Sequence, residues 1–335
     1  GHFCPFCFVK IYFLYYNLCV VINVKQCLMI YNPNSGHTLN GDMLKSAKRI
    51  FPEYGYNLKI VPTQYAGHAK EIVSHLDYAD LVVSVGGDGT FNEVVTGNMQ
   101  RKDRLIVANI PVGTCNDVGT MFGYGKNFEN NVKMLLEGKV KNIDICTVND
   151  RPFVYVAGLG KFINIAYDTP RYLKKKYGYL AYLFEGVKDY FRPIKSYYVD
   201  YEVNGVKKSG YYSFILVSNA NRIAGINNFY KDVKLDDNQF ELLLCNFPTR
   251  RSIIRALRLL IDNDPNNISG FEFYKTSRVK LKFDQYPKKA WCIDGDKLDR
   301  AVKEYEFSTV NDFKVLMPTK NVKKLFLKKI NLIDD

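Results

Sequence analysis

The chain has 335 residues, of which 47% are hydrophobic, and it carries a formal net charge of +13. This length and apolar content predict a well-formed core divided between two domains. The 8 cysteines follow no regular spacing, which argues against a disulfide scaffold and favours a reducing compartment. The positive charge favours either an anionic partner, such as a nucleotide, a nucleic acid or an acidic membrane surface, or simply solubility.

The segment 1–26 differs from the rest of the chain and is interpreted as a leader or a tag-derived segment. Its apolar stretch 6–24 is borderline in length for a membrane-spanning helix and contains Lys10, Asn17 and Asn23, which disfavour a spanning role. An anchor, an extra packed element and a foreign leader all stay open as interpretations.

Strands and helices alternate between residues 27 and 142. The apolar spacing predicts strand 27–31, helix 43–51, strand 57–61, helix 69–76, strands 81–85 and 105–110, and helix 128–136. Strands that alternate with helices indicate a parallel sheet that is covered on both faces. We therefore expect an N-terminal α/β domain with a doubly wound parallel sheet.

From residue 143 to about residue 310, predicted strands follow one another directly. They fall at 153–157, 197–203, 211–217, 240–245 and 279–283, with a hairpin turn at Asn204-Gly205 and helical stretches at 172–190 and 251–261. We expect a second domain that is a mostly antiparallel β-sandwich. The segment 311–335 is expected to pack back on the first domain.

The sharpest motif is Gly86-Gly87-Asp88-Gly89-Thr90, which directly follows the predicted strand ending at Val85. A strand, a glycine-rich turn and a helix start together present backbone N–H groups to a phosphate, and the glycines let it come close. A carboxylate beside bound phosphates requires a cation, so Asp88 favours a Mg²⁺-nucleotide. Taken alone, such a turn is as often merely structural.

Two further loops follow other strands of the predicted sheet. Asn32-Pro33-Asn34-Ser35-Gly36 comes after the first strand, and Pro111-Val112-Gly113-Thr114-Cys115-Asn116-Asp117 comes after the fourth. Ligands of parallel sheets bind at the carboxyl ends of the strands. Each loop by itself is usually a connector, whereas three converging loops favour a nucleotide site.

In this order and spacing, the three motifs resemble the diacylglycerol kinase catalytic domain, which bacterial lipid kinases share with eukaryotic diacylglycerol kinases and sphingosine kinases. The resemblance extends from about residue 27 to about residue 327. It implies an enzyme that transfers the γ-phosphoryl group of ATP, with Mg²⁺, to a lipid hydroxyl. Diacylglycerol is the default acceptor and phosphatidic acid the default product.

The resemblance also implies a set of binding residues. The ATP site would comprise Asn32, Pro33, Asn34, Ser35, Gly36, Thr63, Gly86, Gly87, Asp88, Gly89, Thr90, Asn92, Gly113 and Thr114, with Asp88 also counted as catalytic because it would help hold Mg²⁺-ATP. A structural Mg²⁺ loop would use the Asp237 side chain and the carbonyls of Lys234 and Gln239, a mixed set that hard cations accept. Without the resemblance, this loop is a polar β-turn.

The segment Asp294-Gly295-Asp296 matches the place where the family has Asp-Gly-Glu and carries out general-base work. A kinase that acts on an alcohol needs a carboxylate to accept the hydroxyl proton. Asp296 is one methylene shorter than the family's Glu, so the base is either Asp294 or Asp296. Taken alone, the segment is a hairpin turn.

Two departures from the family pattern fall in the second domain. Residues 218–225 keep only one glycine where the family often has a run, and Lys231-Asp232 replaces a usual proline. They keep two alternatives open. One is a kinase of a soluble acceptor, related to NAD kinases; the other is a nucleotide-binding membrane sensor without catalysis.

Basic and aromatic residues are interleaved at 171–184, which predicts contact with an anionic membrane surface, although a solvated helix or a single-stranded nucleic-acid site would look similar. The sequence carries no RNP aromatics, zinc finger or helix-turn-helix, so no nucleic-acid partner is expected. We expect a cytoplasmic protein that acts peripherally at the inner membrane face. A homodimer is compatible with the sequence and is not required by it.

Overall fold

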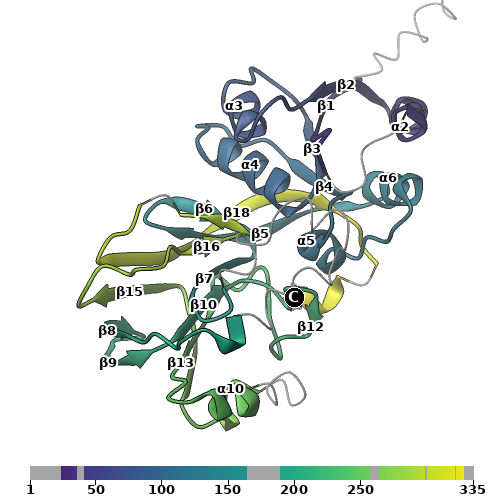
Figure 1. The fold of residues 1–335 in the computed structure, drawn as a ribbon. Helices are drawn as coiled ribbons and strands as arrows, with labels where there is room; N and C mark the ends of the chain where they lie inside the picture. The colour runs from purple at the N-terminus through teal and green to yellow at the C-terminus, as the bar shows by residue number, and fades with distance from the viewer. Residues whose placement is uncertain are drawn as a thin grey trace, which may run out of the picture.

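The computed structural model describes residues 24–35, 41–163, 189–256, 264–298, 300–320 and 322–327. The chain forms an N-terminal lobe of helices and parallel strands and a C-terminal lobe of antiparallel strands (Figure 1). The expectations for residues 1–23, for Gly36 and for the basic stretch 171–184 lie outside the described residues. Among those that are described, no helix is long and apolar enough to cross a membrane.

The N-terminal lobe has a parallel sheet with the strand order β2-β1-β3-β4. Its strands are β1 (Lys25–Tyr31), β2 (Tyr56–Pro62), β3 (Leu81–Gly86) and β4 (Val107–Pro111), and its helices are α2 (Gly41–Glu53), α3 (His68–Ser74), α4 (Asp88–Met99), α5 (Asp117–Met121) and α6 (Phe128–Leu136). Helices α3 and α4 lie on one side of the sheet and α2 and α6 on the other (Figure 1). The predicted doubly wound α/β arrangement is confirmed.

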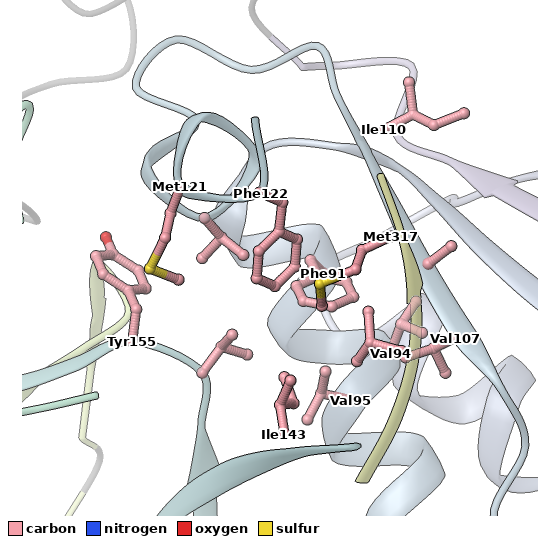
Figure 2. Close-up of a cluster of buried hydrophobic side chains, with 14 of the residues drawn as sticks. Phe91, Val94, Val95, Val107, Ile110, Met121, Phe122, Ile143, Tyr155 and Met317 are labelled. Carbon is pink, nitrogen blue, oxygen red and sulfur yellow. The ribbon is translucent and has the colours of Figure 1, made fainter. Parts of the chain in front are cut away.

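The core of this lobe forms around α4. Phe91 of that helix meets Phe122 edge to face, with ring centroids 6.3 Å apart (Figure 2). Ile143 and Met317, which lie after the predicted N-terminal domain 27–142, are buried in the same cluster (Figure 2). The N-terminal domain and the later part of the chain therefore share one hydrophobic core rather than meeting across a polar linker.

The C-terminal lobe is a sandwich of two antiparallel layers. One layer has the order β14-β13-β10-β7-β16-β17. The other layer includes β15, β8 and β9, which belong to the same sheet as the parallel strands of the N-terminal lobe. The bounds are β7 (Val156–Gly160), β8 (Tyr197–Val203), β9 (Val206–Tyr212), β10 (Phe214–Ser218), β13 (Phe240–Cys245), β14 (Phe271–Thr276), β15 (Arg278–Phe283), β16 (Cys292–Ile293) and β17 (Asp296–Lys297). A second core, which includes Trp291, Tyr305 and Phe307, lies between the layers. The predicted mostly antiparallel β-sandwich is confirmed.

One strand belongs to both lobes. Strand β18 (Glu304–Met317) pairs with β15 in the C-terminal lobe, and its Val315 pairs in parallel with Val107 of β4 (Figure 1). Along its length it also pairs with β5 (Lys139–Val148), which leads from the first lobe into the second. A single sheet of 10 strands therefore runs through the whole molecule.

The structure divides the predicted strand 153–157. The chain instead forms β6 (Arg151–Phe153), a break, and then β7. In the break, the N–H groups of Val154 and Tyr155 donate to the carboxylate of Asp294, at 2.6 and 3.1 Å. The strand is interrupted because these donors serve a side chain instead of a neighbouring strand.

The second predicted helix is observed as α10 (Arg250–Ala256), which begins one residue before the expected range 251–261. Residues 257–263 lie outside the described part of the chain, as does most of the predicted helix 172–190, of which residues 189 and 190 are helical.

A buried acid lies in the second sheet. Glu241 of β13 is 2% exposed, and its neighbours across the sheet are Ser218 of β10 and Lys275 of β14. Its Oε2 atom has no hydrogen-bond partner, and the ammonium of Lys275 is 3.8 Å from Oε1. Burial raises the pKa of Glu241 to about 8 despite Lys275, so the folded protein holds this side chain largely neutral at pH 7.

Replacing Glu241 by Gln should reduce the fall in the free energy of unfolding as the pH rises. The folded state holds a proton that the unfolded chain releases near pH 4.5, so the contribution of Glu241 to the free energy of unfolding decreases between about pH 4.5 and about pH 8. Urea unfolding at pH 5 and pH 8.5 should show a smaller decrease for Glu241→Gln than for the original chain. Glu272→Gln is the control. Burial alone would raise the pKa of Glu272, but hydrogen bonds from three tyrosines and a lysine lower it to about 2, so the contribution of this residue to the free energy of unfolding is lost only in acid. Equal decreases for Glu241→Gln and the original chain would refute the assignment.

Candidate active site

A cavity of about 860 Å³ lies where the predicted loops meet, at the carboxyl ends of β1, β3 and β4. The expected nucleotide-binding residues that line it are Asn32, Asn34, Ser35, Thr63, Gly87, Asp88, Gly89, Thr90, Gly113 and Thr114. Pro33, Gly86 and Asn92 do not line it, and Gly36 is outside the described residues. The cavity therefore brings together most of the residues that the three motifs contribute.

The glycines of two loops allow close backbone packing. Gly87 precedes α4 in an extended conformation, and a Cβ atom on Gly113 would lie 2.5 Å from the Cα atom of Gly87. A Cβ atom on Gly86 would lie 2.4 Å from Oγ1 of Thr90. Since real side chains do not approach so closely, only glycine lets the two loops touch and turns the start of α4 toward the cavity.

Asp88 joins the first glycine loop to the second. Its two carboxylate oxygens accept hydrogen bonds from the N–H groups of Asp117 and Val118, at 2.9 and 3.0 Å, and so cap the start of α5. Burial, followed by the charge of Asp117, raises the pKa of Asp88 to about 7. An ionised carboxylate has about four acceptor positions, so two are left on the side chain that lines the cavity.

A second carboxylate connects the N-terminal lobe to the C-terminal one. Asp117 accepts hydrogen bonds from Nε of Arg222, at 2.9 Å, and from the N–H of Gly225, at 3.0 Å. Arg222 begins a small hairpin of β11 (Arg222–Ile223) and β12 (Ile226–Asn227). Sequence reasoning included Asp117 in a loop motif but did not find its partner, which lies 105 residues away.

Asp294 is saturated with hydrogen bonds. It is 4% exposed, and its Oδ2 accepts from Nδ2 of Asn92 at 2.7 Å and from the N–H of Val154 at 2.6 Å. Its Oδ1 accepts from the N–H groups of Tyr155 and Val156 at 3.1 and 3.0 Å. Burial raises the pKa of Asp294, and these four donors oppose the shift. All of its acceptor positions are used within the protein.

Asp296 has a different environment, although it is only two residues away. It is exposed and lines the cavity. Its Oδ2 lies 4.0 Å from the position that a Cβ atom would take on Gly89 of the first glycine loop. The turn that separates the two aspartates has left-handed backbone at Asp294 and Gly295, with φ of 48° and 90°. Both aspartates line the cavity, but Asp294 is buried and Asp296 is exposed.

The part of the cavity that the C-terminal lobe lines is largely apolar, a property that the sequence patterns did not reveal. This part, called here the apolar end, is formed by Tyr155, Val156, Phe162, Ile163, Leu216, Ile223, Ala224 and Ile226. These residues come from β7, β10 and the β11–β12 hairpin and from the segments next to them. A volume of this size with one polar and one apolar end suits two ligands of different polarity.

The predicted metal loop lies away from the cavity. Asp237 is next to Asp236, and burial and this neighbour raise the pKa of its carboxyl group, with opposing effects from the Gln239 N–H and from Lys275. Burial also raises the pKa of nearby Asp144 to about 6, with Asp237 and Asp236 adding to it. The loop thus holds excess negative charge that a cation would offset.

The donor set of this loop is limited. Among the described residues, no group of three or more His, Cys, Asp or Glu side chains has the arrangement of a metal site. A cation there would therefore need main-chain oxygens in addition to the carboxylate of Asp237. The carbonyls of Lys234 and Gln239, which the sequence predicts as ligands, are of that kind, so the residues fit a hard cation.

Comparison with known proteins agrees with the resemblance seen in the motifs. The sequence profile of the diacylglycerol kinase catalytic domain matches residues 26–148. A diacylglycerol kinase of Bacillus subtilis (strain 168) is 30% identical over 278 residues, which cover 82% of this chain and 90% of that protein. A diacylglycerol kinase of Staphylococcus epidermidis is 31% identical over 223 residues, 66% of this chain and 70% of that one.

Solved structures share the fold. A crystal structure of a diacylglycerol kinase from Bacillus anthracis str. Sterne aligns with a TM-score of 0.69 at 21% identity and covers 89% of this chain and 98% of its own. A second structure from the same strain gives a TM-score of 0.74, also at 21% identity, over 88% of this chain and 96% of its own. The identity with the Bacillus subtilis enzyme extends over most of both chains, and the chain therefore belongs to the diacylglycerol kinase family.

Proposed function

We propose that this enzyme transfers the γ-phosphoryl group of Mg²⁺-ATP to the hydroxyl group of a lipid, with diacylglycerol as the acceptor and phosphatidic acid as the product. The observation that carries the proposal is that one cavity brings a glycine loop at a helix start together with an exposed carboxylate and an apolar wall. The names of the relatives favour diacylglycerol over other lipid alcohols.

The polar end of the cavity suits the nucleotide. The start of α4, the glycines before it and Thr90 offer N–H and hydroxyl donors to phosphate oxygens. Asn32, Ser35, Thr63 and Thr114 add polar side chains around them. The carboxylate of Asp88, a residue that lines the cavity, has acceptor positions left for a hydrated magnesium ion that accompanies the phosphates.

The exposed carboxylate suits the general base. In the reaction we propose, Asp296 accepts the proton of the lipid hydroxyl as that oxygen bonds to the γ-phosphorus atom. The bond from the γ-phosphorus atom to the bridging oxygen breaks, and ADP leaves with the electron pair. Asp294 is the weaker candidate, because its four hydrogen bonds leave no acceptor position for a substrate proton.

Magnesium has two proposed places. When bound with the nucleotide, it would neutralise charge that develops on the phosphates. A structural ion would be held by Asp237 and by the carbonyls of Lys234 and Gln239, where it would offset the excess charge described above. The protein would work at the cytoplasmic face of a membrane, because ATP arrives from water and the acceptor from the lipid phase.

Replacing Asp296 by Asn should separate catalysis from folding. Loss of the base is expected to lower the transfer of labelled γ-phosphate to diacylglycerol in mixed micelles by about 10²- to 10⁴-fold. Because Asp296 is exposed, the thermal unfolding midpoint and the affinity for ATP should not change. Asp294→Asn is the matched variant and should lower the free energy of unfolding by about 1–3 kcal/mol, because an amide group would face its donors.

Full activity in Asp296→Asn would exclude this residue as the base. If the original chain bound ATP but transferred phosphate to no lipid, the nucleotide-binding sensor would be favoured instead. Transfer to a water-soluble alcohol without micelles or vesicles would favour a kinase of a soluble acceptor.

Replacing Gly113 by Ala should weaken ATP binding, measured by calorimetry, because the added methyl group would collide with the backbone of Gly87 and force the two loops apart. Gly125→Ala is the control, since a Cβ atom there meets nothing within 4 Å. Equal ATP affinity in the two variants would show that the close contact of the loops does not shape the nucleotide site.

A further inference from the structure

Two segments of the C-terminal lobe, 190–196 and 246–253, form a basic and aromatic patch that includes the start of α10, the helix labelled in Figure 1. Their exposed residues include four basic ones and no acidic one, whereas Phe247 and Ile253 are buried. Phe191 is 63% exposed, and the guanidinium of Arg250 lies over its ring at 6.0 Å and donates to its carbonyl oxygen at 2.8 Å. Phe191 thus presents an exposed aromatic ring among basic side chains.

The patch is fixed to the apolar end of the cavity. Lys161, which is 3% exposed, donates through its ammonium to the carbonyl oxygens of Asp189 and Arg192. The carboxylate of Asp189 accepts from the N–H of Phe162 at 2.9 Å, and Phe162 lines the cavity. A surface that starts at Phe191 is thus joined by short hydrogen bonds to the wall proposed to hold the lipid.

We propose that this patch docks the enzyme on the surface of an anionic lipid bilayer, so that the acceptor enters the apolar end of the cavity directly from the membrane. The proposal rests on the lipid-kinase function above and adds where the membrane is contacted. Phe191 would insert at the level of the headgroups, where aromatic rings are favoured. The arginines Arg250 and Arg251 would pair with lipid phosphates, which guanidinium groups bind well.

The test is binding of the full chain to vesicles, which needs no catalysis. Sedimentation with vesicles of phosphatidylglycerol and phosphatidylcholine should show binding that weakens with salt and is far weaker with phosphatidylcholine alone. The double variant Phe191→Ala/Arg251→Gln should bind about tenfold more weakly, since one basic residue near the surface accounts for about fivefold and the lost ring for the rest. It leaves the hydrogen bond from Arg250 to the Phe191 carbonyl in place.

The matched control is Tyr211→Ala/Lys207→Gln on strand β9, which also removes one exposed aromatic ring, 60% exposed, and one exposed positive charge. This variant should bind vesicles like the original chain. Should Phe191→Ala/Arg251→Gln prove poorly folded in a thermal melt, the single variant Arg251→Gln replaces it, with an expected loss of about fivefold.

Vesicle binding that is equal in the patch variant and the control variant would overturn the proposal, as would binding of single-stranded DNA in place of anionic vesicles. Phosphorylation of a short-chain diacylglycerol in water tests the kinase function separately from membrane docking. If the patch variant keeps that activity but loses vesicle binding, docking is supported. If the original chain binds vesicles through the patch and phosphorylates no lipid, only the kinase function fails.

Discussion

The buried carboxylate of Asp294 is the interaction on which the site depends. Its four hydrogen bonds reach Asn92 on α4 in the N-terminal lobe and three successive N–H groups that run from the break after β6 to the first residue of β7. A buried charge is tolerated only when such donors surround it, so these elements hold one another in place. The same turn sets Asp296 beside the first glycine loop.

The glycine loops and the apolar end of the cavity are also connected through charged side chains. Asp88 holds the start of α5, and Asp117 at that start holds Arg222 and Gly225 of the β11–β12 hairpin. The hairpin in turn contributes Ile223, Ala224 and Ile226 to the apolar end. A shift of the first glycine loop would therefore be transmitted to the apolar end through a chain of contiguous, partly buried contacts.

Most helices and strands, and the meeting of the motif loops at one cavity, could be predicted because glycine loops and apolar periodicity are local signals in the sequence. It missed β18, whose Asn311-Asp312 resembles a turn; the structure accommodates these residues as a bulge between Val310 and Phe313, with Asp312 in left-handed conformation. It also left the base undecided between Asp294 and Asp296. Their different environments depend on N–H groups about 140 residues earlier, and such distant contacts are not visible in a local pattern.

The shared strand β18 has a consequence for how the chain is made. Val107 of β4 pairs with Val82 on one side, but its partner on the other side, Val315, lies about 200 residues later, so that edge of the parallel sheet stays open until β18 has been synthesised. Open strand edges recruit other strands, and contacts that are distant in sequence form slowly. A ribosome-bound N-terminal lobe would thus be a client for chaperones, and truncation before β18 would yield an aggregating fragment rather than a free α/β domain.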